Sequence, residues 1–286
     1  GLTPAQQAKT QLIQKLAPLA DLYVCDAFAA AHRAQPSLCG FQEALPSAMG
    51  RLFEKEYSVL TRLLDEPARP CTFVLGGAKI ADAFLMLETV LTNGSADKVL
   101  TGGLVANIIL AGMGINIGQG SMDFIFKSNY GEYIEKAKII YEQYADQIVL
   151  PIDLAFRQEG VRREEGWKNI PEGAAVTDIG TRAAREYADI ILASKTVFVN
   201  GPMGVFEEPE SEVGTKVVWE ALGSTAAYTV LGGGDSITAT QKYNLMEKVD
   251  YICTGGGAMI RFLTGEELPV VKALKSASRH FKTEDK

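Results

Sequence analysis

Short apolar runs that end in glycine alternate with helix-like segments over the larger part of the chain. After the first glycine pair, Ile80, Phe84, Leu87 and Leu91 recur every three or four positions, which is the spacing of a helix that packs by one face. Continuous apolar strands are typical of parallel sheets that helices cover on both sides. The pattern predicts an α/β fold with a doubly wound parallel sheet. The predicted strands are residues 72–75, 97–101, 147–151, 196–199, 227–231 and 250–253.

The segments outside this alternation predict two helices, one strand and one exposed segment. A helix is expected at the start, where Thr3 and Pro4 precede a helical run of apolar residues, and a strand is expected in LYVCDAF, residues 22–28. Residues 51–67 carry one apolar helical stripe that ends at a proline, and we expect this helix to connect two domains. The charged, glycine-containing residues 156–173 are expected to form an exposed excursion from the sheet domain.

Composition limits the partners and the location. The 286 residues carry a formal net charge of −7 and a pI near 5.1, which argues against a nucleic-acid partner. The 4 cysteines lie far apart and show no metal-ligand spacing, so we expect reduced thiols and a cytoplasmic location. No apolar run approaches the roughly 20 residues that span a bilayer, so we expect no membrane partner.

Glycines follow several of the predicted strands, in FVLGGAK, VLTGGL, VFVNGPMG, VLGGGDS and YICTGGGA. The carboxyl ends of parallel strands face the ligand crevice, where glycine lets backbone N–H groups approach a phosphate and a following helix adds its partly positive N-terminus. The alternative is that these are ordinary strand-to-helix turns. Neither a P-loop nor a dinucleotide fingerprint occurs, because GMGINIG, residues 112–118, has one residue too many and is expected to be a turn.

A set of motifs, taken together and in this order, carries a family resemblance. The motifs are DAFAAAHRAQPS, LGGAKIADAF, VNGPMGVFE, LGGGDS and TGGGAMIRFLTGEELP, and with them the whole chain resembles phosphoglycerate kinase, most closely its archaeal branch. The resemblance implies a two-domain, hinge-bending enzyme that is usually a monomer. Such an enzyme transfers a phosphoryl group between 1,3-bisphosphoglycerate and ADP with Mg²⁺, giving 3-phosphoglycerate and ATP.

The resemblance also implies which residues bind the nucleotide. Asp235 would approach the Mg²⁺ beside the phosphates, and Glu207 would hold the ribose hydroxyls. Ser236 would lie at the phosphates and could cap the next helix. The implied nucleotide-binding residues are Gly76, Gly77, Gly102, Asn200, Pro202, Glu207, Gly233, Gly234, Asp235 and Ser236.

The catalytic residues implied by the resemblance are Lys79, Gly234 and Gly256. Lys79 matches a lysine that contacts the migrating phosphoryl group, where a point charge suits a charge-spreading transition state. The alternative for Lys79 is a solvated lysine at a helix start. Gly256 lies in residues 255–257, which match a second glycine cluster facing this group, and the alternative there is a simple helix entry turn.

Arg33 and His32 would hold the phosphate of the three-carbon substrate. Arginine suits this task because its planar fork makes two charge-assisted hydrogen bonds to an oxyanion. For His32, a structural role and contact with the substrate are equally favoured alternatives. Asp26 directly follows a predicted strand, and we expect it to act in a turn or as a helix cap.

The resemblance divides the chain into parts. Residues 1–50 would be the C-terminal part of the N-terminal substrate domain, a second α/β domain, and residues 51–70 an interdomain helix and linker. Residues 71–264 would form the nucleotide-binding domain, and residues 265–286 a tail that returns toward the N-terminal domain. The family's opening strand and a basic loop with histidine and arginine have no counterpart in the chain. We therefore expect this chain to bind nucleotide but to show little turnover by itself.

The chain departs from the family pattern at two positions. Ala83 stands where many members carry a second lysine, which weakens the inferred contact to the nucleotide α-phosphate. Cys25 replaces an asparagine beside the substrate loop. A non-catalytic nucleotide-binding module derived from the family is the alternative function. A dinucleotide-dependent dehydrogenase fits the strand and helix order but lacks the fingerprint.

Overall fold

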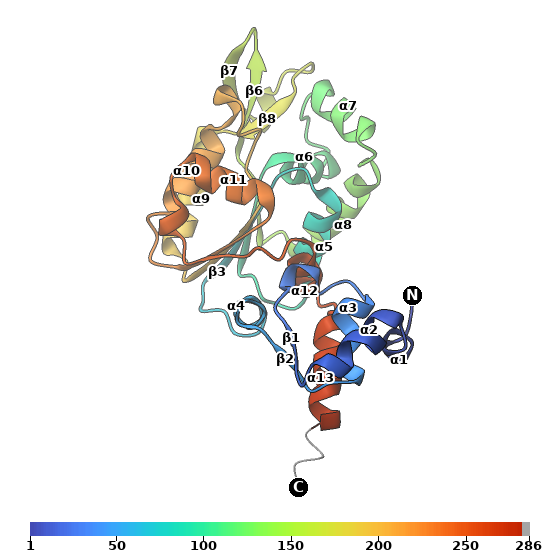
Figure 1. Cartoon of the computed structure of the whole chain (residues 1–286). Helices are drawn as coiled ribbons and strands as arrows, with labels where there is room; N and C mark the ends of the chain where they lie inside the picture. The colour runs from blue at the N-terminus through green and yellow to red at the C-terminus, as the bar shows by residue number, and fades with distance from the viewer. Residues whose placement is uncertain (282–286) are drawn as a thin grey trace. The chain divides into compact units, whose positions relative to one another are not determined.

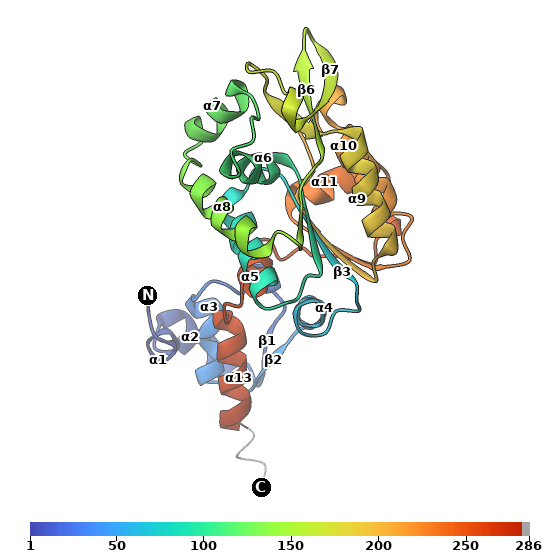
Figure 2. The same ribbon diagram turned by 180° about the vertical axis from the view of Figure 1, so that it is seen from behind.

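The structure is a computed structural model, and it describes residues 1–281 as two compact units (Figure 1; Figure 2 shows the same ribbon from behind). Residues 66–253 form the larger unit, and residues 1–65 form the smaller unit with the described residues from 254 onward. Each unit contains its own parallel sheet. Among residues 1–281, no helix is both long and apolar enough to cross a membrane.

The larger unit has a six-stranded parallel sheet, which confirms the predicted fold class. Its strands are β3 (Cys71–Leu75), β4 (Lys98–Thr101), β5 (Ile148–Val149), β9 (Thr196–Asn200), β10 (Tyr228–Gly232) and β11 (Tyr251–Ile252). Their order across the sheet is β11-β10-β9-β3-β4-β5. Every residue of the central strands β3 and β9 is buried, because helices cover both faces of the sheet.

Helices pack on both faces of this sheet (Figures 1 and 2). One face carries α9 (Thr181–Ala193), α10 (Val213–Leu222) and α11 (Gly234–Lys242), and the other carries α5 (Ile80–Thr92), α6 (Gly103–Gly112) and α8 (Glu132–Tyr144). Val74 packs with Tyr187 and Trp219 in the core of the first face. Phe73 and Phe198, whose rings lie 5.2 Å apart, point to the opposite face, because successive side chains of a strand alternate.

A small antiparallel sheet extends from the larger unit, with β6 (Asp153–Gln158) between β7 (Val161–Gly166) and β8 (Val176–Ile179). Helix α7 (Gln119–Lys127) precedes it in the chain. The expectation of an exposed excursion over residues 156–173 is wrong in part, because Phe156 is buried and the Arg162 side chain is only 15% exposed. Arg162 and Glu164 pair with each other instead of facing solvent, whereas Arg157 and Arg163 are exposed as expected.

The smaller unit has two parallel strands, β1 (Tyr23–Cys25) and β2 (Ser47–Met49). Around them lie α1 (Pro4–Ala8), α2 (Gln11–Leu16), α3 (Pro36–Cys39), α4 (Arg51–Asp65), α12 (Gly257–Leu263) and α13 (Pro269–Phe281). Asp26 Oδ1 accepts the Phe53 N–H at 2.9 Å in the first turn of α4, which confirms the expected cap. All 4 cysteines of the chain are free and buried.

Residues 254–264 belong to the smaller unit, whereas the sequence assigned them to a nucleotide domain of residues 71–264. The contacts of Thr254 and Gly255 explain the difference. Thr254 donates both its N–H and its hydroxyl to Glu56 Oε1, each at 2.8 Å, and Glu56 is buried in α4. A Cβ at Gly255 would lie 2.8 Å from a ring carbon of Phe28, so this segment packs tightly on the smaller unit's own core.

Candidate functional site

Glycine turns interlock at the carboxyl edge of the larger sheet. Gly77, which follows β3, donates its N–H to Pro202 O at 2.8 Å, and Gly103, which follows β4, donates to Met203 O at 2.7 Å. Gly201 has a φ of 99°, and a Cβ there would lie 3.0 Å from Gly77 N. The turns therefore need glycine to pack on one another, and they bring several strand ends to one place.

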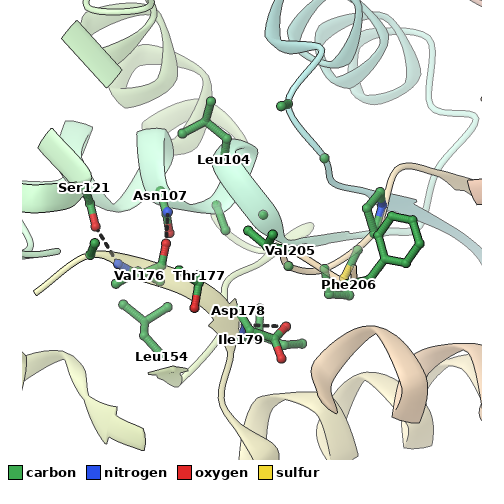
Figure 3. A pocket seen from close by; sticks show the side chains of 18 of the residues that line it. Leu104, Asn107, Ser121, Leu154, Val176, Thr177, Asp178, Ile179, Val205 and Phe206 are labelled. Carbon is green, nitrogen blue, oxygen red and sulfur yellow. Dashed lines mark hydrogen bonds between the residues drawn. The ribbon is translucent and has the colours of Figure 1, made fainter. Parts of the chain in front are cut away.

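A cavity of about 440 Å³ opens beside these turns. One wall comes from α6, α7 and β8, from which Leu104, Asn107, Ser121 and Val176 line it (Figure 3). Ser121 Oγ accepts the Val176 N–H at 2.8 Å, and Asn107 Nδ2 donates to Val176 O at 3.4 Å. These polar side chains thus hold the backbone of β8, which leaves a largely apolar wall. Of the residues that the sequence assigned to the nucleotide, Gly77, Pro202, Glu207 and Asp235 line the cavity.

A small depression of about 10 Å³ adjoins the cavity and shares Gly77, Ala78 and Asp235 with it. Lys79 Nζ lies 3.9 Å from Asp235 Oδ2, and the two side chains are 64% and 54% exposed. Such an exposed pair is weak in water, so both groups remain available to a charged ligand. The predicted residues Gly76, Lys79, Asn200, Gly233 and Ser236 line this depression.

Ser236 does not cap α11, so that part of its predicted role is wrong. Its side chain is buried and accepts the Gly201 N–H at 2.7 Å, while α11 begins after Gly233, which has a φ of 85°. Gly102 lines neither hollow, and a Cβ there would lie 2.6 Å from Met203 Sδ. Gly102 therefore packs against Met203 and does not face either hollow.

A buried carboxyl group, Asp178, forms part of the cavity's inner boundary and has no counterpart in the sequence predictions. Its Oδ2 accepts the Gly214 N–H at 2.7 Å and an Arg162 Nη1 hydrogen at 2.9 Å, and its Oδ1 accepts the Ile179 N–H at 2.9 Å. Burial raises the pKa of Asp178 to about 7, although Gly214 and Arg162 act in the opposite direction. The aspartate thus ties β8 to the start of α10 beneath the cavity.

The predicted substrate residues lie in the smaller unit. A Cβ at Gly257 would lie 3.5 Å from His32 Nε2, so His32 contacts the start of α12, which follows Gly256. Burial lowers the pKa of His32, and the positive charges of Arg33 and Arg261 lower it further. His32 is therefore neutral at neutral pH. Arg33 is exposed, so its guanidinium group is accessible to an anionic ligand.

Sequence reasoning missed the half of the cavity that faces away from the glycine turns. That half is formed mainly by apolar residues of α6, α7 and β8, which have the same pattern as ordinary core residues. Ala83 and Cys25, the two departures from the family pattern, are both buried. Within residues 1–281, no group of three or more His, Cys, Asp or Glu side chains is arranged to hold a metal ion.

The fold and this site define an α/β protein with a cavity at the carboxyl edge of a parallel sheet, where α/β proteins of this class bind their ligands. The family model for phosphoglycerate kinase matches residues 3–266. The chain belongs to the phosphoglycerate kinase family, which confirms the resemblance.

Known relatives agree with this assignment. The chain is similar to phosphoglycerate kinase from Methanothermobacter thermautotrophicus, with 45% identity over 97% of this chain and 67% of that protein. The crystal structure of phosphoglycerate kinase from Pyrococcus horikoshii matches with a TM-score of 0.87 and 40% identity over 97% of this chain and 69% of that one. The structure of phosphoglycerate kinase from Coxiella burnetii matches with a TM-score of 0.86 and 31% identity over 94% and 69%. The chain thus spans about two thirds of the length of the relatives it matches.

Proposed function

We propose that the cavity binds ADP or ATP, and that the protein transfers a phosphoryl group between 1,3-bisphosphoglycerate and ADP. One observation carries the proposal: a cavity of about 440 Å³ has Glu207 in its lining and continues, through Asp235, into a depression edged by glycine backbone and Lys79. A nucleotide has the matching order of an apolar base, a ribose with hydroxyls and a chain of anionic phosphates. Family membership supports the same substrates and a place in cytoplasmic glycolysis.

The nucleotide base fits the apolar wall formed by α6, α7 and β8. Glu207, whose carboxylate is exposed, would accept hydrogen bonds from the ribose hydroxyls. The phosphates would lie at the start of α11, where Gly234 is open to approach and the helix dipole favours negative charge. The glycine turns thus act at the phosphate end, and side chains act at the other end.

Asp235 fits a site for Mg²⁺ bound together with the nucleotide. It lies in the first turn of α11 with about half of its side chain exposed. Mg²⁺ in phosphate sites is typically held by one or two carboxylates, the substrate phosphates and water. When bound, the ion would neutralise charge on the phosphates. Lys79 would place a positive charge near the migrating phosphoryl group, and Arg33 would hold the anionic end of the three-carbon substrate.

Calorimetry with ADP and Mg²⁺ tests the nucleotide site directly. We expect saturable heat in the micromolar to millimolar range and a higher unfolding temperature at saturating nucleotide, because a ligand that binds only the folded state stabilises it. Neither effect at millimolar nucleotide, in folded protein, would refute the proposed site. A coupled assay for ATP formation from ADP and 1,3-bisphosphoglycerate tests transfer separately, and binding without turnover would favour the non-catalytic module.

Replacing Glu207 by alanine should weaken ADP binding by roughly tenfold, because a hydrogen bond to a charged group contributes about 1.5 to 3 kcal/mol and this site is open to water. Glu208→Ala is a matched control, since Glu208 is the next residue and pairs instead with Arg157 at 2.8 Å. Titration calorimetry measures both variants. Equal affinities of the Glu207 and Glu208 variants would show that Glu207 does not hold the ribose.

A further inference from the structure

Lys242 links separate segments of the cavity region. It is the last residue of α11, and its Nζ donates to Phe206 O at 2.6 Å and lies 2.7 Å from Glu212 Oε2. Phe206 directly precedes Glu207 in the chain, and Glu212 directly precedes α10. One ammonium group therefore joins the end of α11 to the loop that carries the proposed ribose ligand.

The surroundings of Lys242 fix its position. Its Nζ lies 6.0 Å from the centre of the Phe206 ring and 5.9 Å from that of Tyr243, whose hydroxyl lies 3.1 Å from Glu212 Oε2. Hydrogen bonding from Lys242 lowers the pKa of Glu212, so the carboxylate stays ionised at neutral pH. The side chains of Lys242 and Glu212 are 35% and 22% exposed, and a partly desolvated pair holds its geometry better than a solvated one.

The opposite end of α11 carries the phosphate-facing residues. Gly234 and Asp235 open the helix that Lys242 ends, and the helix is 9 residues long. A helix is stiff over this length, so a contact at its last residue fixes the loop at Phe206 relative to its first turn. Because Lys242 donates to the carbonyl of Phe206, it restrains the backbone from which the Glu207 side chain projects.

We propose that Lys242 is a positioning residue that sets Glu207 at the correct distance from the start of α11, so that one nucleotide can engage both. This inference rests on the proposed function, because it assigns the ribose to Glu207 and the phosphates to α11. Lys242 itself does not line the cavity. Its effect should therefore appear only with ligands that have ribose hydroxyls for Glu207 to hold.

The test compares ADP with 2′,3′-dideoxy-ADP, both with Mg²⁺, on the wild type and on Lys242→Met. We expect the substitution to weaken ADP binding about fivefold to tenfold, in line with the loss of one well-placed charged hydrogen bond. Dideoxy-ADP should lose less than twofold, because it has no hydroxyl for Glu207. Lys98→Met is the matched control, since Lys98 Nζ also donates to a carbonyl at 2.6 Å, that of Asp146, and lies at the amino end of β4.

The outcomes separate this inference from the proposed function. If the wild type binds no ADP, the proposed function fails and the inference fails with it. If the wild type binds ADP and Lys242→Met weakens ADP and dideoxy-ADP equally, the positioning role alone is overturned. Lys242→Arg keeps the cation and should bind ADP more tightly than Lys242→Met. If Lys242→Met is unstable, the same two-ligand comparison on Glu212→Gln decides, and equal losses for both ligands again overturn the role.

Discussion

Replacing Arg162 by methionine should lower the free energy of unfolding by about 3 to 5 kcal/mol at pH 8, because it leaves a buried carboxylate without its cation. The Arg162 side chain is 15% exposed and that of Asp178 is 0% exposed. Arg162 also donates to Glu210 O at 2.7 Å and to Ile179 O at 2.9 Å. Methionine keeps much of the apolar volume, so the loss would report on charge and hydrogen bonds.

The loss should depend on pH. Burial raises the pKa of Asp178 from 3.8 to about 7 in the folded protein. Protonated Asp178 therefore contributes stability to the folded protein. This contribution is complete below about pH 4 and is lost as the pH rises from about 4 to 7. Removal of Arg162 takes away an interaction that lowers this pKa, so the buried aspartate can be neutralised at a higher pH. Denaturant unfolding should show a smaller difference between variant and wild type at pH 6 than at pH 8.

Arg157→Met provides the control on the neighbouring strand. Arg157 pairs with Glu208 at 2.8 Å, almost the same distance as in the Arg162 pair, but the two side chains are 43% and 44% exposed. An exposed pair contributes about 0 to 1 kcal/mol, so this variant should be close to the wild type at both pH values. Equal stability of the two variants, or a larger Arg162 effect at pH 6, would contradict the interpretation of Asp178.

The sheet could be predicted from the sequence because strands that are buried on both faces consist almost entirely of apolar residues. Residues 72–75 and 196–199 are apolar throughout, or nearly so, and the structure buries every residue of β3 and β9. The edge strands β5 and β11 are shorter than predicted, since each pairs with one neighbour over two residues. An apolar run does not reveal where its pairing partner ends.

The antiparallel sheet β7-β6-β8 could not be predicted from its own residues. Arg162 and Glu164 resemble solvated charges in the sequence, yet Arg162 bonds to Glu164 at 2.6 Å and to Asp178, which lies 16 residues away. Burial of such charges depends on partners that only the fold brings together. The boundary at residue 253 was missed for a similar reason, because Thr254 is held by Glu56 at a separation of 198 residues.

The candidate site was predictable where backbone geometry demands glycine. The turns at Gly77 and Gly201 have positive φ and close backbone contacts, and only glycine satisfies both. Ser236 was assigned to a cap from its place after glycine, but the packing of α11 directs its hydroxyl to Gly201 instead. The apolar wall at Leu104 and Val176 gave no signal, because a ligand wall and a core have the same composition.

Replacing Gly234 by alanine should raise stability slightly while it weakens ADP binding by roughly 10- to 100-fold. The structure gives no internal reason for glycine here: a Cβ at Gly234 meets no described atom within 4 Å, and Gly234 is the first residue of α11. Alanine is preferred over glycine in helices by up to about 1 kcal/mol. A bound phosphate would supply the missing reason, because a methyl group would hold it away from the N–H groups of the helix start.

Two measurements on Gly234→Ala decide whether phosphate approach explains this glycine. Loss of hydrogen bonds to a charged phosphate would cost about 1.5 to 3 kcal/mol, which corresponds to the expected loss of affinity. Gly173→Ala is the matched control, since a Cβ there also meets no described atom within 4 Å and Gly173 lies outside α11 and every other helix. It should leave ADP affinity unchanged. Higher stability together with weaker ADP binding, seen in Gly234→Ala but not in Gly173→Ala, would support phosphate binding at the start of α11. Unchanged ADP affinity in Gly234→Ala would refute it.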